Sequence, residues 1–350
     1  MHKLVNMNGF DLSTVQRIYK GSTLVDSVYL NMEKIWPLHD YSRDYLTITS
    51  LTDNNSIGWK ADNQDYTKTI SVSTDSGRTW TDKTSSLEGT ELAILNTGAN
   101  LLIKGNNTSY GLSSNHYTTN NFTSTNIFDI SGNIMSLVYG DNFRNQTTLQ
   151  EERTFIRMFY NTKVISAQNL VLPATSMTIS CYSRLFENCS YLTTAPKILP
   201  ALVLNHNCYD FMFSNCTNLV TPPELPAMTL SDQCYGYMFK YCTSLTTPPE
   251  LPATTLAEYC YYAMFLGCSG LITAPELPAS TLAIMCYSAM FADCTNLNYI
   301  KMLATDISAA NCLNNWVQNV SSTGTFIKKT NTTIPTGSSG IPESWTVQNI

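Results

Sequence analysis

The chain contains 350 residues, of which 13% are charged, and its formal net charge is −6. This length exceeds that of one ordinary domain of ~100 to 150 residues, so we expect two or three structural units. The charged fraction is well below the usual ~25%, and the acidic balance excludes the basic surface of a nucleic-acid-binding protein. The sequence has no run of ~18 apolar residues, which argues against membrane insertion.

Residues 1–40 are predicted to form a β-rich docking arm. The first residues lack the apolar core and the small-residue cleavage site of a secretory signal peptide, so we expect the chain to fold in the cytoplasm. Residues 18–37 duplicate a ten-residue pattern, IYKGSTLVDS and then VYLNMEKIWP, in a segment too short to bury its own core. We therefore expect another chain to bury its apolar side chains. The candidate docking residues are Ile18, Val25, Val28, Ile35 and Trp36.

Residues 44–125 are predicted to form a small antiparallel β-sandwich. They contain short alternating runs such as LTITSL, TISVSTD, ELAIL and LLIKG, with turn residues between them. Residues 126–154 are expected to connect this unit to the rest of the chain.

The octapeptide STDSGRTW, residues 73–80, matches the Asp-box of sialidases, S-x-D-x-G-x-T-W. In that motif the Asp and Gly shape a hairpin turn and the Trp packs behind it. A sialidase propeller would carry several boxes and a cluster of arginines, whereas this chain has one box. The match therefore predicts a structural hairpin, and an Asp-box glycosidase is the least favoured function.

Eleven cysteines, all beyond residue 180, reveal an internal repeat. Ten of them form pairs eight residues apart that recur every 26 or 27 residues, and Cys312 continues the spacing without a partner. Their positions are 181, 189, 208, 216, 234, 242, 260, 268, 286, 294 and 312. A period of this length is typical of a solenoid. The spacing of Cys260, Met264, Phe265 and Cys268 predicts one buried face of a short helix. The following LITAPELP segment predicts an extended stretch, so we expect an α/β solenoid over residues 155–317.

Both ends of the repeat array are expected to be modified. Residues 155–174 keep the MF and LPA sequences of the other repeats, whereas threonines occupy the two cysteine positions, at Thr154 and Thr162. This indicates a degenerate first repeat. Residues 318–350 are predicted to form a C-terminal cap of two short strands around a Gly/Ser/Pro turn.

The cysteines are interpreted as core residues. Structural zinc favours cysteine pairs two to four residues apart, whereas these pairs lie eight apart on the buried face. Stacked repeats could bring equivalent cysteines within disulfide range, but the regular spacing and folding in the cytoplasm favour reduced thiols. The four histidines are scattered, and no G-x-S-x-G, H-E-x-x-H or phosphate-binding loop occurs. The sequence therefore predicts no enzyme, no cofactor and no metal site.

The segments MFxxC and CTSLTTPPELP resemble the cysteine-containing leucine-rich repeats of the BspA-like type. Together with GNIMSLVYGDNF and GIPESWTV, they look like one family of repeat proteins from gut Bacteroidales and their tailed phages. The arm resembles N-terminal segments of phage tail and head-fibre proteins that anchor to the virion. The resemblance implies a non-enzymatic virion fibre, adhesin or decoration protein that is assembled in the host cytoplasm. The alternative is a bacterial surface adhesin of the leucine-rich-repeat type.

This resemblance implies two kinds of partner: other virion proteins for the arm, and a host-surface glycan or protein for the repeats. It also allows a homo-oligomer. The candidate ligand-binding residues recur at equivalent positions of the repeats and are Glu224, Glu250, Glu276, Thr221, Thr246, Thr247 and Thr273. We expect the glutamates to stack ~5 Å apart and to repel one another. The row is therefore either a solvated acidic rim or a site for a cation or ligand.

Overall fold

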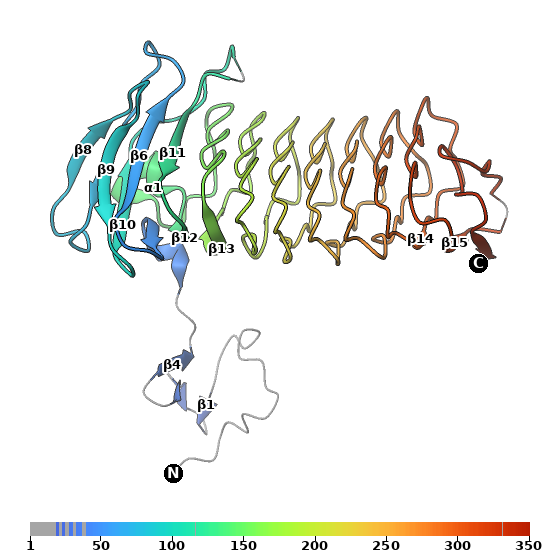
Figure 1. Cartoon of the computed structure of the whole chain (residues 1–350), viewed down its shortest axis with the longest axis horizontal. Helices are drawn as coiled ribbons and strands as arrows, with labels where there is room; N and C mark the ends of the chain where they lie inside the picture. Colours follow the sequence, from blue (N-terminus) through green and yellow to red (C-terminus); the bar gives the residue numbers. More distant parts are fainter. Residues whose placement is uncertain are drawn as a thin grey trace.

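The computed structural model of the chain describes residues 40–115, 117–330 and 332–350, together with the backbone of four short N-terminal strands (Figure 1). These strands form two antiparallel pairs, β1 (Tyr19–Lys20) with β2 (Thr23–Leu24) and β3 (Val28–Leu30) with β4 (Glu33–Trp36). Ile18 and Val25 lie outside the described residues, as do the side chains of Val28, Ile35 and Trp36. Their role in docking therefore stays a prediction.

Two β-sheets follow the arm (Figure 1). The six-stranded sheet has the order β13-β12-β5-β10-β7-β8, and the three-stranded sheet has the order β11-β6-β9. Within them every strand pair is antiparallel except β12 with β13. The strands are β5 (Leu46–Ser50), β6 (Asn55–Ala61), β7 (Thr69–Ser73), β8 (Thr81–Thr84), β9 (Thr90–Leu95), β10 (Asn100–Gly105), β11 (Asn120–Ser124), β12 (Phe128–Asn133) and β13 (Val164–Val171).

The side chains of these strands alternate between core and solvent, as expected for strands with one buried face. In β5, Leu46 and Ile48 are fully buried, whereas Thr47 and Thr49 lie on the opposite face. Trp59 of the three-stranded sheet is also fully buried, and its ring packs 4.8 Å from that of Phe122. The buried residues of both sheets belong to one hydrophobic cluster.

Helix is almost absent from the described ranges. It is restricted to α1 (Ser136–Tyr139) and the 3₁₀ turns η2 (Tyr41–Arg43) and η3 (Gly140–Asn142). Strand β12 comes from residues 126–154, and β13 comes from the first of the repeat-bearing residues. The six-stranded sheet therefore joins directly onto the repeats through the parallel pair β12 and β13.

Residues 155–317 form a row of stacked segments, which lie side by side along the long axis of the molecule (Figure 1). The short helices predicted for these residues are wrong, because the segments consist of consecutive turns. Even-numbered residues from Cys234 to Cys242 donate their N–H to the carbonyl three residues earlier. Odd-numbered residues from Tyr235 to Tyr241 donate to the carbonyl 25 residues later, in the next segment.

The turns explain why the spacing of apolar residues in the sequence resembles that of a helix. Gln233, Tyr237 and Tyr241 have φ values of 53°, 54° and 59°, so the backbone enters the left-handed region at every fourth residue. A four-residue turn period brings side chains spaced 0, 4 and 8 to one side, as a helix would. The predicted buried face is accordingly confirmed, since Cys260 and Phe265 are fully buried.

Aromatic rings stack from one segment to the next through the whole row. Successive phenylalanines from Phe159 to Phe291 have ring centroids 5.4 to 5.7 Å apart. A second ladder runs from Tyr182 to Tyr287 at 5.7 to 6.0 Å. Each segment thus buries its apolar face against equivalent residues of its two neighbours.

The C-terminal residues form a small parallel sheet of β14 (Tyr299–Lys301), β15 (Thr325–Lys328) and β16 (Thr346–Asn349). The two strands predicted for the tail are confirmed as β15 and β16. Trp316 closes the aromatic row and is fully buried, with its Nε1 donating to the carbonyl of Gly340 at 2.7 Å. The tail therefore covers the last stacked segment.

Candidate ligand-binding surface

The proline-rich segments of the repeats, residues 222–226, 248–252 and 275–278, lie along one edge of the stacked segments, which we call the proline-rich edge. Glu224, Glu250 and Glu276 are all exposed on it. Glu224 forms a parallel bridge with Ile198 of the preceding segment. The register partner of Glu224 is thus the uncharged Ile198, and the N–H of Glu224 donates to the carbonyl of the adjacent Lys197 at 2.9 Å.

The acidic row is neutralised at its C-terminal end. The ammonium of Lys301 lies 2.8 Å from Oε2 of Glu276, and this hydrogen bond raises the pKa of Lys301 above its usual value. Glu250 lies in the middle of the row with a glutamate in the segment on either side. The least compensated charge of the row is therefore Glu250.

Two shallow grooves run between neighbouring proline-rich segments. One has a volume of about 440 Å³ and is lined by residues 222–226, Pro249, Glu250 and Pro252. The other has a volume of about 390 Å³ and is lined by residues 248–252, Pro275, Glu276 and Pro278. Glu250 lies in both grooves, so one carboxylate is presented to two adjacent hollows with apolar proline walls.

The threonines of the candidate set are exposed as well. Thr221 forms a parallel bridge with Thr194, and Thr273 forms one with Tyr299. Thr246 and Thr247 are exposed on the segment between them. All four candidate threonines are thus accessible to a ligand. In the sequence each of them lies just before a segment that carries one of the three glutamates.

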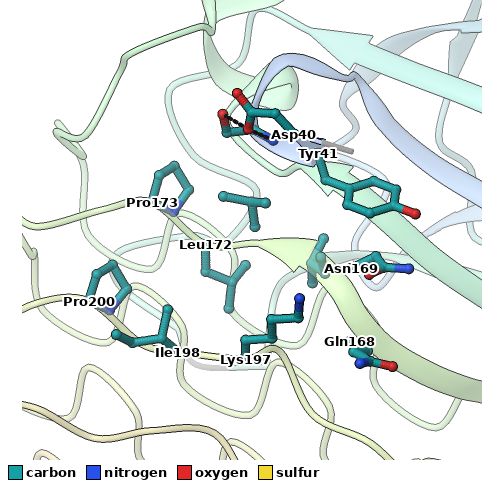
Figure 2. Close-up of a pocket in the computed structure, with 12 residues that line it drawn as sticks. Asp40, Tyr41, Gln168, Asn169, Leu172, Pro173, Lys197, Ile198 and Pro200 are labelled. Atoms are coloured by element: carbon teal, nitrogen blue, oxygen red, sulfur yellow. Dashed lines mark hydrogen bonds between the residues drawn. The ribbon is translucent and has the colours of Figure 1, made fainter. Parts of the chain in front are cut away.

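A third hollow lies at the N-terminal end of the stacked segments (Figure 2). It has a volume of about 440 Å³ and lies between β13, the segment at Lys197 and the chain around Tyr41. Figure 2 shows the Lys197 side chain extending into the hollow, with Leu172, Pro173, Ile198 and Pro200 along the apolar side. The wall is therefore mixed, with a cation and an aromatic ring among aliphatic groups.

The cysteines lie inside the stacked segments and all eleven are free and buried. The second cysteine of each pair donates its thiol to a phenylalanine carbonyl of the preceding segment, at 2.9 to 3.2 Å, from Cys189 through Cys294. Only a protonated thiol can donate, and burial raises the pKa of Cys189 to about 12. The cysteines are therefore placed for packing and hydrogen bonding rather than for nucleophilic chemistry. Within the described residues no group of three or more metal-ligating side chains is gathered.

The Asp-box forms the predicted hairpin between β7 and β8. The carboxylate of Asp75 accepts hydrogen bonds from the backbone and the hydroxyl of Thr79, which hold its pKa below its usual value. Trp80 Nε1 donates to the carbonyl of Gly77 at 3.1 Å. These hydrogen bonds join residues of the box to one another and so stabilise the turn itself.

Sequence reasoning missed a polar cluster on the turn side of the stacked segments. Asp210 is 6% exposed, and burial raises its pKa to about 8. Its Oδ1 accepts a hydrogen bond from Gln233 at 3.3 Å, and the nearby Arg184 pairs with both oxygens of Glu187 at 2.9 and 3.0 Å. The equivalent residues of the other cysteine-bearing repeats are uncharged: Ser183, Gly236, Tyr262, Ser288 and Asn314. A single carboxylate at this position was therefore visible in the sequence but was not predicted to matter.

Comparisons with models of protein families, with curated proteins and with solved structures gave no match to this chain. In the ranges that the structure describes, there is also no helix with the length and apolarity needed to cross a membrane.

Proposed function

We propose that this chain is a non-enzymatic structural protein of a phage virion, a fibre, adhesin or decoration protein that presents its repeats to the host surface. The observation that supports a presenting role is the division of the stacked segments into a fully buried core and an exposed edge, on which two equivalent grooves lie between successive segments. A surface of repeated, equivalent grooves suits a ligand that is itself repetitive, such as a cell-surface glycan.

In this proposal each part of the chain has one task. Residues 1–40 dock to other virion proteins, and a β-sandwich over residues 44–125 acts as a spacer. Residues 155–317 form a leucine-rich-repeat solenoid with a 26-residue period, covered by the cap at residues 318–350. The resemblance of the arm to phage fibre anchors, rather than the fold, favours the virion over the bacterial surface.

Binding would occur along the proline-rich edge. The proline rings offer apolar C–H surfaces, and the exposed hydroxyls of Thr221 and Thr273 can exchange hydrogen bonds with sugar hydroxyls. Glu250 stands in two grooves and supplies an acceptor or a ligand for a bridging divalent cation.

Mass spectrometry of purified virions tests the proposal. The full chain should be present in particles, whereas a chain lacking residues 1–39 should stay soluble and be lost from them. The deletion keeps Asp40, whose side chain accepts a hydrogen bond from the N–H of Ser42 at the start of η2. Absence of the full chain from particles, together with its recovery on the surface of bacterial cells, would favour the alternative bacterial adhesin.

A further inference from the structure

The outer face of the six-stranded sheet carries a hollow that is separate from the proline-rich edge. Thr47 and Thr49 of β5 point to this face because their neighbours in the strand are buried. The register places Thr47 between Leu102 of β10 and Ser131 of β12, and places Thr49 opposite Asn100. Short polar side chains from three adjacent strands thus form the floor of the hollow.

Two arginines stand at its rim. Arg43 comes from η2 and Arg144 follows η3, and both are exposed. Arg144 Nε donates to the backbone carbonyl of Arg43 at 3.1 Å, which fixes the two residues side by side. The ion pairs found among the described residues do not involve either guanidinium, although Lys104 and, less strongly, the charge of Arg144 lower the pKa of Asp141. Asp44 also lines the hollow and limits how many anionic groups it can accept.

The aromatic wall of the hollow is held in place from behind. The ring of Tyr45 lies 5.0 Å from that of Trp80 and 5.1 Å from that of Phe143. Its hydroxyl donates to Asp141 at 2.7 Å, and Asp141 in turn pairs with Lys104 at 2.8 Å. A wall fixed by packing, a hydrogen bond and an ion pair loses little conformational entropy when a ligand binds.

We propose that this hollow binds a carboxylated saccharide. The guanidinium groups of Arg43 and Arg144 match a carboxylate, to which arginine donates paired hydrogen bonds. Tyr45 offers aromatic surface for the pyranose ring, while Thr49, Asn100 and the other floor residues meet its hydroxyls. The hollow has a volume of about 600 Å³, which falls in the usual range for small-ligand sites.

A nucleic acid or another polyanion fits the site less well. The whole chain carries a net charge of −6 and would repel a long anionic polymer. Arg43 and Arg144 opposite Asp44 leave one uncompensated positive charge, because Lys104 offsets the neighbouring Asp141, and this suits a single carboxylate on an otherwise neutral ring. The site is independent of the proline-rich edge, so the proposed function and this inference can fail separately.

Isothermal titration calorimetry with the full chain tests the inference. The probes are oligogalacturonate, oligoglucuronate and sialyllactose, and the matched neutral probe is fully methyl-esterified oligogalacturonate. We expect at least one carboxylated probe to bind, and expect its affinity to exceed that of a neutral counterpart by tenfold or more. Arg43→Gln and Arg144→Gln should each weaken binding at least tenfold. Both should leave the melting temperature nearly unchanged, since both side chains are exposed and the hydrogen bond lost in Arg144→Gln, to the carbonyl of Arg43, lies at the surface.

Lys329→Gln is the control, because it removes the same charge from an exposed residue of the C-terminal tail. It should bind like the parent chain, and so should the variant in which Glu224, Glu250 and Glu276 are all replaced by Gln. The inference is overturned if none of the three carboxylated probes binds, if the esterified probe binds equally well, or if both arginine variants keep the parent affinity.

Discussion

The thiol of Cys242 donates a hydrogen bond of 3.2 Å to the carbonyl oxygen of Phe213, which lies 29 residues earlier in the chain. The same carbonyl accepts the N–H of Cys216 at 3.0 Å, so both of its lone pairs are used. In the first segment Thr162 takes this position, and its hydroxyl donates to Phe159 within the segment at 2.9 Å. The repeated cysteine is therefore a donor that links neighbouring segments as well as an apolar filler.

Replacing Cys242 should destabilise the chain, whereas adding reductant to the parent chain should not. Cys242→Ala removes the sulfur from a fully buried site and should lower the free energy of unfolding by about 1 to 3 kcal/mol. Urea titration measures this change. The parent chain should melt at the same temperature with and without reductant, and eleven thiols should titrate after denaturation. A clear loss of melting temperature in reductant would show that disulfides are present instead.

Replacing Gly267 by alanine should destabilise the chain, because the ring of Tyr241 lies where the new Cβ atom would stand. The φ of Gly267 is +73°, and a Cβ atom there would lie 2.2 Å from the ring of Tyr241. Gly89 has φ +89° but open space around it, so it is the matched control. Gly89→Ala should cost only the backbone strain, ~1 kcal/mol, whereas Gly267→Ala should cost at least ~1 kcal/mol more. Equal melting temperatures for the two variants would contradict the contact with Tyr241.

Asp210 should make the chain less stable as the pH rises. Burial raises its pKa from 3.8 to about 8, so between these values the folded chain holds a proton that the unfolded chain has lost. The free energy of unfolding should then fall by up to ~1.4 kcal/mol per pH unit across this window and level off above about pH 8. Arg184 and Glu187 lie nearby, and the arginine opposes the shift.

Asp210→Asn isolates this contribution. The amide removes the titration and should flatten the pH dependence between pH 4 and 8, because an uncharged side chain no longer loses a proton on unfolding. Thermal denaturation of both chains over this pH range provides the measurement. Parallel curves for the parent and the variant would show that Asp210 is not the titrating group.

Neutralising the acidic row should change binding but not folding. Replacing Glu224, Glu250 and Glu276 by Gln relieves repulsion along the row and removes the exposed ion pair to Lys301, two small effects that oppose each other. We expect the free energy of unfolding to change by less than ~1 kcal/mol, and host adsorption or its dependence on divalent cations to change. The exposed Glu258→Gln variant is the control and should adsorb like the parent. Unchanged adsorption of the triple variant would show that the three glutamates are solvated surface residues with no role in binding.

Much of the core could be predicted from the sequence, because a regular repeat reveals which positions recur and hence which are buried. The type of local structure could not, since turns with a four-residue period and a helix place Cys260 and Met264 on the same side. The parallel pairing of β12 with β13 also escaped prediction, because it depends on contacts between distant segments. At the proline-rich edge the exposure of Glu250 was foreseeable, but the register that pairs Glu224 with Ile198 was not.

The hollow on the sheet could not be found from the sequence for a related reason. Arg43 and Arg144 are 101 residues apart, and neither belongs to a motif. Thr47, Asn100 and Ser131 are ordinary outward-facing strand residues when considered singly. The strand order brings Thr47, Asn100 and Ser131 to one face, and the short turns η2 and η3 place the two arginines at its rim.

Because the aromatic rings stack at a constant spacing, the length of the row depends on the number of stacked segments. Each added segment advances the rings by about 5.5 Å, as the 5.5 Å between Phe186 and Phe213 shows, and it makes the same contacts as the segment before it. Loss or gain of one whole unit by recombination between near-identical copies would therefore shorten or lengthen the molecule by one step without creating a new interface. The number of stacked segments therefore sets the length of this row, at about 5.5 Å for each segment.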